Sequence, residues 1–148
     1  MGLGELIFPR ACAGCGAPGE VLCPQCRDHL RQPPYMVARP RPLGAPVYAL
    51  GPYSDIRRRI IIGMKERGNR PVREYVGAVF AAGLAHLSAR GDIPREYTLV
   101  PAPTRPRSAR ARGGDPVSAV CHAAAQHQRV GVCAVSYTHL TLPTIYSV

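Results

Sequence analysis

Two Cys-x-x-Cys pairs near the N-terminus constrain this chain more than any other feature. The segment CAGCGAPGEVLCPQC, residues 12 to 26, holds four of the six cysteines of the 148-residue sequence. A Cys-x-x-Cys loop places two thiolates on one side of a tight turn, and two such loops that face each other form a tetrahedral cage of sulfur ligands. Such a cage suits Zn²⁺. We therefore predict that one zinc ion is bound by Cys12, Cys15, Cys23 and Cys26.

The predicted zinc site is structural rather than catalytic, because four protein ligands leave no open coordination position. A redox-active Cys-x-x-Cys pair and four unrelated cysteines remain as alternatives, although the preceding LIFPRA is a poor match to the strand that a thioredoxin-like motif requires. His29 lies three residues beyond Cys26 and could replace a ligand. We expect it instead on the solvent-facing side of a short helix.

The sequence predicts neither export nor membrane insertion. The start, MGLGELIF, lacks the basic region of a signal peptide, and the longest apolar run, YVGAVFAAGLAHL, is far shorter than the roughly 20 residues of a membrane-spanning helix. We therefore expect a cytoplasmic protein with reduced thiols, where clustered cysteines are metal ligands more often than disulfides.

The chain is strongly basic, with 19 Lys and Arg against nine Asp and Glu and a net charge of +10. This charge favours anionic partners such as nucleic acid, phosphorylated metabolites or acidic proteins. Lys65 is the only lysine, so codon usage in a GC-rich genome is an alternative source of the arginines. The hydrophobic fraction of 46% is enough for a folded core.

We divide the chain into four parts. They are a four-cysteine zinc knuckle over residues 1–31, a proline-rich linker with little regular structure over 32–46, a partial domain over 47–134, and a tail over 135–148 that looks non-native. The tail lacks Ala, Arg and Gly, which dominate the rest, and resembles translated adapter sequence. A native β-strand is the alternative, since Thr, Val, Ile and Tyr favour strands.

The pattern of the third part predicts an α/β fold. Strands are expected over 47–53 and 97–103, and helices over 55–67, 72–89 and 117–127. Ser54 and Asp115 have the side chains of helix N-caps, and Gly68 is a helix stop.

Residues 104–115 read as a basic loop, and Cys121 as a core residue. His122 and His127 read as surface residues. The order of elements favours a parallel sheet, but two strands are few for one, so we expect an incomplete domain.

Three segments together resemble the ComF family of competence-associated, phosphoribosyltransferase-like proteins. They are LIFPRACAGCGAPGEVLCPQCRDHL, which is similar to the zinc knuckle of that family, YSDIRRRIIIGMKERG, and LVPAPTRPRSARARGGDPV. The resemblance covers residues 3 to 130. It implies an incomplete type I phosphoribosyltransferase-like parallel sheet with a small N-terminal zinc knuckle.

The resemblance also implies a ligand site for phosphoribosyl pyrophosphate. In such folds the loop after the Val-Pro-x-Pro strand, here residues 101–104, lies near the pyrophosphate, and a following arginine-rich loop closes over the ligand. The implied phosphate-binding residues are Lys65, Thr104, Arg105 and Arg112. Without the family, a solvated basic loop is an equal reading of 105–114, and a water-facing stripe explains the basic residues of 57–67.

The sequence departs from the family after Asp115. The two aspartates and the Thr-Thr-Gly run that hold Mg²⁺, the ribose and the 5′-phosphate have no counterpart, because no acidic residue follows Asp115. We therefore expect the front part of a longer protein, inactive as it stands. Only the full-length protein would bind Mg²⁺ with phosphoribosyl pyrophosphate.

Three functions remain in competition. The first is a phosphoribosyltransferase-related protein of DNA uptake and competence or of nucleotide metabolism. The second is a non-catalytic zinc-knuckle adaptor that binds single-stranded DNA or a DNA-uptake motor such as a competence helicase. The third is a poorly folded fragment without function. The absence of Trp weighs against base stacking and so against the second.

Overall fold

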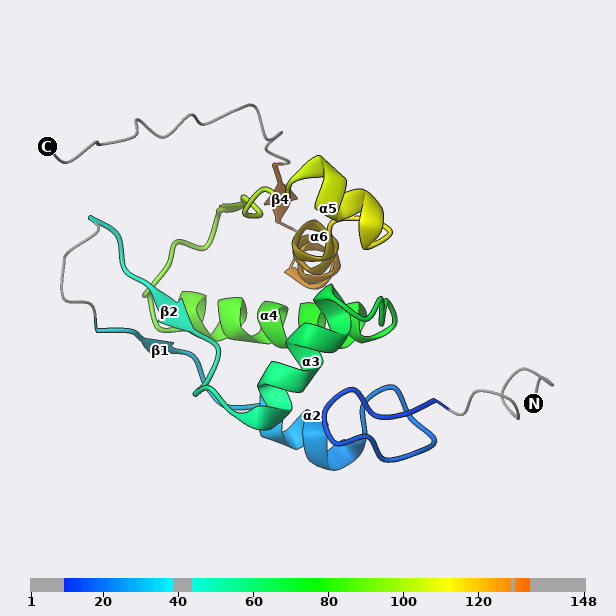
Figure 1. The fold of residues 1–148 in the computed structure, drawn as a ribbon. Coiled ribbons are helices and arrows are strands. Elements are labelled where there is room, and N and C mark those ends of the chain that lie inside the picture. The colour runs from blue at the N-terminus through cyan, green and yellow to red at the C-terminus, as the bar shows by residue number, and fades with distance from the viewer. Residues whose placement is uncertain (1–9, 39–43, 129, 134–148) are drawn as a thin grey trace, which may run out of the picture.

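A computed structural model describes residues 10–38, 44–128 and 130–133 as a mixed arrangement of helices and very short strands (Figure 1). The helices are α2 (Pro24–Leu30), α3 (Asp55–Lys65), α4 (Val72–Ala89), α5 (Pro106–Ala111) and α6 (Pro116–Gln128). The strands are β1 (Tyr35–Met36), β2 (Tyr48–Ala49), β3 (Thr98–Leu99) and β4 (Gly131–Val132). The predicted tail, 135–148, lies outside the described residues. The predicted division into domains stays a prediction.

The helix starts follow from capping residues that the sequence reveals. Ser54 Oγ accepts a hydrogen bond of 3.3 Å from the backbone N–H of Arg57 at the start of α3. Asp115 Oδ1 accepts bonds of 2.9 and 3.3 Å from the N–H groups of Val117 and Ser118 at the start of α6, whose first residue is Pro116. These side chains pair backbone donors that a helix leaves open, and both predicted caps are confirmed.

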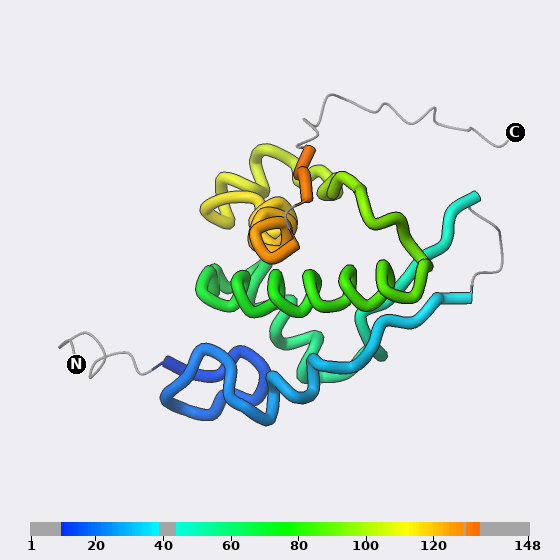
Figure 2. Tube along the Cα trace, turned by 180° about the vertical axis from the view of Figure 1, so that it is seen from behind, coloured from blue at the N-terminus to red at the C-terminus, as the bar shows by residue number. Residues whose placement is uncertain are grey.

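The longest helix, α4, lies between the N-terminal knuckle and α6. In Figures 1 and 2 α6 is seen end-on beside α4, so the two helices cross steeply. The crossing depends on small side chains: a Cβ atom placed on Gly77 would lie 2.5 Å from Ala123 Cβ and 3.3 Å from the carbonyl oxygen of Val120. On the other side of α4, Gly83 faces Leu50. Helix α4 is therefore packed against other parts of the chain on two sides.

The strands form two sheets of two strands each in the described part of the chain. Strand β1 pairs with β2 in antiparallel fashion, and the N–H of Val37 donates to the carbonyl of Val47 at 2.8 Å. The predicted linker 32–46 therefore contains a short strand. Tyr35 and Met36 can pair with β2 because they follow Pro34 and keep their own backbone N–H donors. Strand β3 pairs with β4 in parallel, Thr98 opposite Gly131 and Leu99 opposite Val132.

One segment that we expected to be a loop is partly helical. Residues 106–111 form α5, within the stretch predicted as a basic loop over 104–115. Pro106 stands at the first helical position, where its missing N–H costs nothing, and the arginines and alanines that follow are good helix formers. The arginines of this stretch indicate charge, but they also favour a helix, which a reading as a basic loop leaves out.

The larger hydrophobic cluster joins the knuckle to the helices. Cys12, Leu22 and Cys26 of the knuckle are buried together with Ile60 of α3 and Val72 of α4. A second cluster lies between α4, β3 and α6 and includes Cys121, whose predicted core position is confirmed. The knuckle is thus packed as part of the core.

No helix among the described residues is long and apolar enough to cross a membrane.

The close crossing of α4 and α6 can be tested with two glycine-to-alanine variants. Gly77→Ala should destabilise the protein by about 1–3 kcal/mol, because the new methyl group meets Ala123 and the backbone of Val120. Gly63→Ala in α3 is the matched control. Its Cβ would meet nothing within 4 Å, so better helix propensity should stabilise the fold by up to about 1 kcal/mol. Urea unfolding measures both, and equal effects of the two changes would contradict the packing described.

Candidate metal centre

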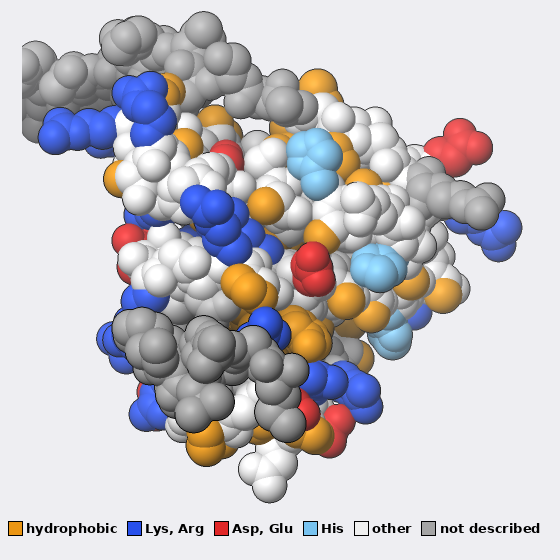
Figure 3. Space-filling view, turned by 90° about the vertical axis from the view of Figure 1, so that its right-hand side faces the viewer, with side chains coloured by type: hydrophobic (Ala, Val, Ile, Leu, Met, Phe, Trp, Pro, Cys, Tyr) orange, Lys and Arg blue, Asp and Glu red, His pale blue; other side chains and the backbone are white. Residues whose placement is uncertain are grey.

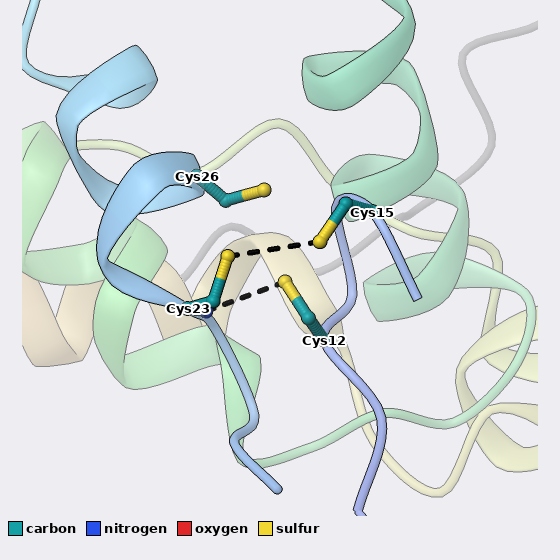
Figure 4. A group of neighbouring side chains, drawn as sticks. All are labelled: Cys12, Cys15, Cys23 and Cys26. Carbon is teal, nitrogen blue, oxygen red and sulfur yellow. Dashed lines mark hydrogen bonds between the residues drawn. The ribbon is translucent and has the colours of Figure 1, made fainter. Parts of the chain in front are cut away.

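The four cysteines of the two Cys-x-x-Cys pairs converge on one point, as Figure 4 shows. Their Sγ atoms all lie within 4.8 Å of one another, and those of Cys15 and Cys23 are 3.6 Å apart. All four thiols are free. A tetrahedral ion with metal–sulfur bonds of about 2.3 Å holds its sulfurs about 3.8 Å apart, so a small contraction brings the cluster to that geometry. The four residues therefore lie close enough to hold a metal ion.

The first Cys-x-x-Cys pair lies in a turn that glycine makes possible. The N–H of Gly16 donates to the carbonyl of Cys12 at 2.8 Å, and Gly16 adopts a φ of 83°, which side chains disfavour. A Cβ atom on Gly14 would lie 2.6 Å from Cys26 Sγ. Gly14 therefore lets the backbone of the first pair approach a sulfur of the second.

The second Cys-x-x-Cys pair coincides with the start of α2. Cys23 is the residue before the helix, Pro24 is its first residue, and Cys26 lies in its first turn. Proline fits this position because its fixed φ matches the helix. The helix thus turns Cys26 towards Cys23, while the adjacent Leu22 is buried and anchors the pair in the core.

The protein environment shifts the pKa values of two thiols in the cluster in opposite directions. Burial alone would raise the pKa of the Cys12 thiol, but hydrogen bonds from the backbone of Cys23, Cys15 and Gly14 outweigh it and lower the pKa to about 6. The N–H of Cys23 is 3.3 Å from Cys12 Sγ. Burial, together with the neighbouring thiols, raises the pKa of Cys26. Protein groups alone thus favour the thiolate form of Cys12 and disfavour that of Cys26, which a bound cation would stabilise.

Arg27 ties the knuckle to α4. Its side chain donates to the carbonyl of Leu22 at 2.7 Å and to the hydroxyl of Tyr75 at 3.3 Å, and its guanidinium lies 4.8 Å from the centre of the Tyr75 ring. A cation–π contact at a partly exposed site contributes about 0.5–1 kcal/mol. Arg27 therefore contacts a residue, Tyr75, that lies 48 positions later in the sequence.

Arg57 and His29 tie the knuckle to α3. Arg57 donates to the carbonyls of His29 and Leu30, at 3.2 and 3.5 Å, which are open acceptors at the end of α2. Burial lowers the pKa of Arg57. His29 Nε2 is 2.8 Å from Ser54 Oγ. Both residues differ from expectation, because they are half-buried and hold two helices together, whereas we expected them to face water.

The residues implied to bind phosphate fall into two neighbourhoods. Thr104 donates to Asp115 at 2.9 Å, and Arg105 is an exposed residue before α5. Arg112 forms an ion pair of 2.7 Å with Glu66, which directly follows Lys65. The fold thus brings Arg112 to the end of α3. Whether these four residues bind a ligand stays a prediction.

The structure shows two cavities that sequence reasoning did not find. One, of about 480 Å³, is mainly apolar and lies between the end of α2, Leu50 and the α4 face that includes Ala82 and His86. It contains neither the cysteines nor the implied phosphate-binding residues. The other, of about 380 Å³, lies between the knuckle and three arginines of the α3 region, at 58, 59 and 67. The doubled arginine at 58–59 was the only signal for it in the sequence.

Three more residues lie where the sequence predicts. His122 and His127 are exposed, as expected, and His122 Nδ1 lies 2.8 Å from the carbonyl of Ser118. Burial raises the pKa of Cys121, whose thiol lies in the core and outside the metal cluster. None of the three offers a nucleophile or base to the cluster.

No model of a known protein family matches the chain, and no curated protein and no solved structure matches it.

The assignment of the four metal ligands predicts that substitutions of two buried cysteines affect metal affinity differently. The protein should bind one Co²⁺ per chain, as the visible spectrum of tetrahedral thiolate coordination measures. Cys26→Ser removes a ligand and should weaken that affinity by more than about 100-fold, since lost outer-shell partners alone cost 10–100-fold. Cys121→Ser, a change of the same size in the second hydrophobic cluster, should leave it unchanged. Equal affinity of both variants would contradict the assignment.

Proposed function

We propose that the four-cysteine cluster binds Zn²⁺ and that the ion is structural. The convergence of four sulfurs within 4.8 Å of one another carries this proposal. Four thiolates are the ligands that zinc takes in closed structural sites, and they leave no position for substrate or water. The ion would hold the turn around Gly14 against α2 and so keep Leu22 and Cys26 in the shared core.

Zinc is tested by elemental analysis of protein purified without chelators. The expected result is one zinc per chain, together with a lower melting temperature after removal of the metal, because the energy of metal binding stabilises the folded state. A Cys121→Ser variant should keep its zinc. Protein that unfolds cooperatively at the same temperature with and without metal would contradict a structural role.

We propose further that the chain is a ComF-like, phosphoribosyltransferase-related protein of DNA uptake or nucleotide metabolism. The three quoted segments motivate this proposal, and their arrangement in space supports it. Strand β3 leads into the segment 101–104, and β3 and β4 are parallel as in such sheets. Arg112 forms an ion pair with Glu66, the residue that follows Lys65 at the end of α3. Phosphoryl groups favour sites with arginine forks and backbone donors.

The chain by itself is proposed to be inactive. Thr104 is engaged with Asp115, and Arg112 with Glu66, so two of the four implied ligands already have protein partners. No acidic residue after Asp115 is present to hold Mg²⁺ or the ribose hydroxyls. Ligand binding would require the aspartate pair and the Thr-Thr-Gly run that the family carries.

Calorimetry with phosphoribosyl pyrophosphate and Mg²⁺ tests this proposal. This chain should bind phosphoribosyl pyrophosphate no more tightly than it binds pyrophosphate alone, whereas a longer protein that continues into the acidic loop should bind it more tightly than pyrophosphate. In that longer protein Arg112→Gln should weaken binding by about 10-fold or more, as expected for a lost hydrogen bond between charged groups. Arg95→Gln, at an exposed position before β3, is the matched control. Failure of the longer protein to bind would remove the proposal.

A further inference from the structure

A basic cavity lies between the metal-binding turn and α3. It measures about 380 Å³ and is bordered on one side by residues 12–16, and on the other by Arg58, Arg59, Ile62 and Arg67. None of its lining residues is acidic or aromatic. The volume falls in the range of about 300–1,000 Å³ that small-molecule sites occupy.

The three guanidinium groups of this cavity have no protein partner in the described part of the chain. The ion pairs there engage Arg27, Arg31, Arg90 and Arg112. No hydrogen bond or ion pair involves the side chains of Arg58, Arg59 or Arg67 within residues 10–38, 44–128 and 130–133. Three like charges around one cavity repel one another, and an anion between them would lower that energy.

Their placement on α3 directs the arginines to one side. Arg58 and Arg59 stand four and three residues before Ile62, which places them on the same helix face as that residue. Arg67 comes just after the helix ends at Lys65. Figure 3 views the molecule from the side of the knuckle, and most of the Lys and Arg side chains visible there lie in its left half.

The negatively charged metal cage is an alternative partner for these three arginines. Four thiolates around a divalent ion carry a net charge of about −2, and Cys15 at the border of the cavity is exposed. Three guanidinium groups exceed that charge, so the cavity stays net positive. Each guanidinium also carries five N–H donors in a planar fork, more than a neighbouring sulfur can accept.

We propose that this cavity binds linked phosphate groups, supplied either by a free oligophosphate or by the backbone of a nucleic acid strand. Arginine forks match phosphate oxygens in bidentate pairs. A lining without aromatic side chains offers bases nothing to stack on, so the recognised chemistry is the phosphate. The cavity shares no lining residue with those implied for phosphoribosyl pyrophosphate, and the proposal does not depend on that function.

The test uses the zinc-loaded chain at low salt, titrated in separate arms with tripolyphosphate and with a dT15 oligonucleotide. The variant Arg58→Gln/Arg59→Gln/Arg67→Gln should weaken binding by at least about 100-fold, since each lost bond between charged groups costs about tenfold or more. The control Arg31→Gln/Arg90→Gln/Arg95→Gln removes the same charge elsewhere and should weaken it by less than about threefold. Zinc content is measured for each protein, and single variants replace the triple one if it loses metal.

Each outcome decides the proposal. Arginine-dependent binding of tripolyphosphate supports it with a free oligophosphate as the source. Binding of the oligonucleotide alone, with the same dependence, supports it with a nucleic acid backbone as the source. Equal weakening by both triple variants overturns it, because binding would then follow net charge alone. So would the absence of binding in both arms, or single variants that lose zinc and leave phosphate binding unchanged, since the arginines would then serve the cage.

Discussion

Four sulfur atoms within 4.8 Å of one another set the geometry of the N-terminal third of the chain. The constraint is local in sequence, because glycines at 14 and 16 and a helix start at Pro24 suffice to bring the thiols together. Its effects extend further, because Cys12 and Cys26 pack against Ile60 and Leu22 in one cluster. The four-cysteine cluster and the hydrophobic core therefore share residues, and the geometry of either one limits the other.

Most helices could be predicted from the sequence because their signals are local. Ser54 and Asp115 mark helix starts by the chemistry of their own side chains, and the apolar pattern of 72–89 matches α4 closely. The four-cysteine cluster was predictable for the same reason, since the spacing of two Cys-x-x-Cys pairs alone limits where their sulfurs can lie.

The features that escaped prediction depend on partners far away in sequence. Arg57 reads as a surface residue in its own helix, yet it donates to carbonyls 28 and 27 positions earlier. The short strand β1 forms only because β2 lies beside it, and no pattern in a proline-rich stretch announces that pairing. Likewise, Gly77 is visible in the sequence, but the helix that it lets approach is known only from the fold.

The shared core has a consequence for how much of the protein exists in folded form. A ligand that binds only the native chain stabilises it by RT ln(1 + [L]/Kd), so under the proposed metal binding the folded population would follow the concentration of free metal. Since Leu22 and Cys26 contact the same cluster as α3 and α4, scarcity of the ion would loosen more than the turn that binds it. Under the proposed metal binding, chains left without the ion would be cleared by proteases, and the cellular abundance of the protein would depend on metal supply.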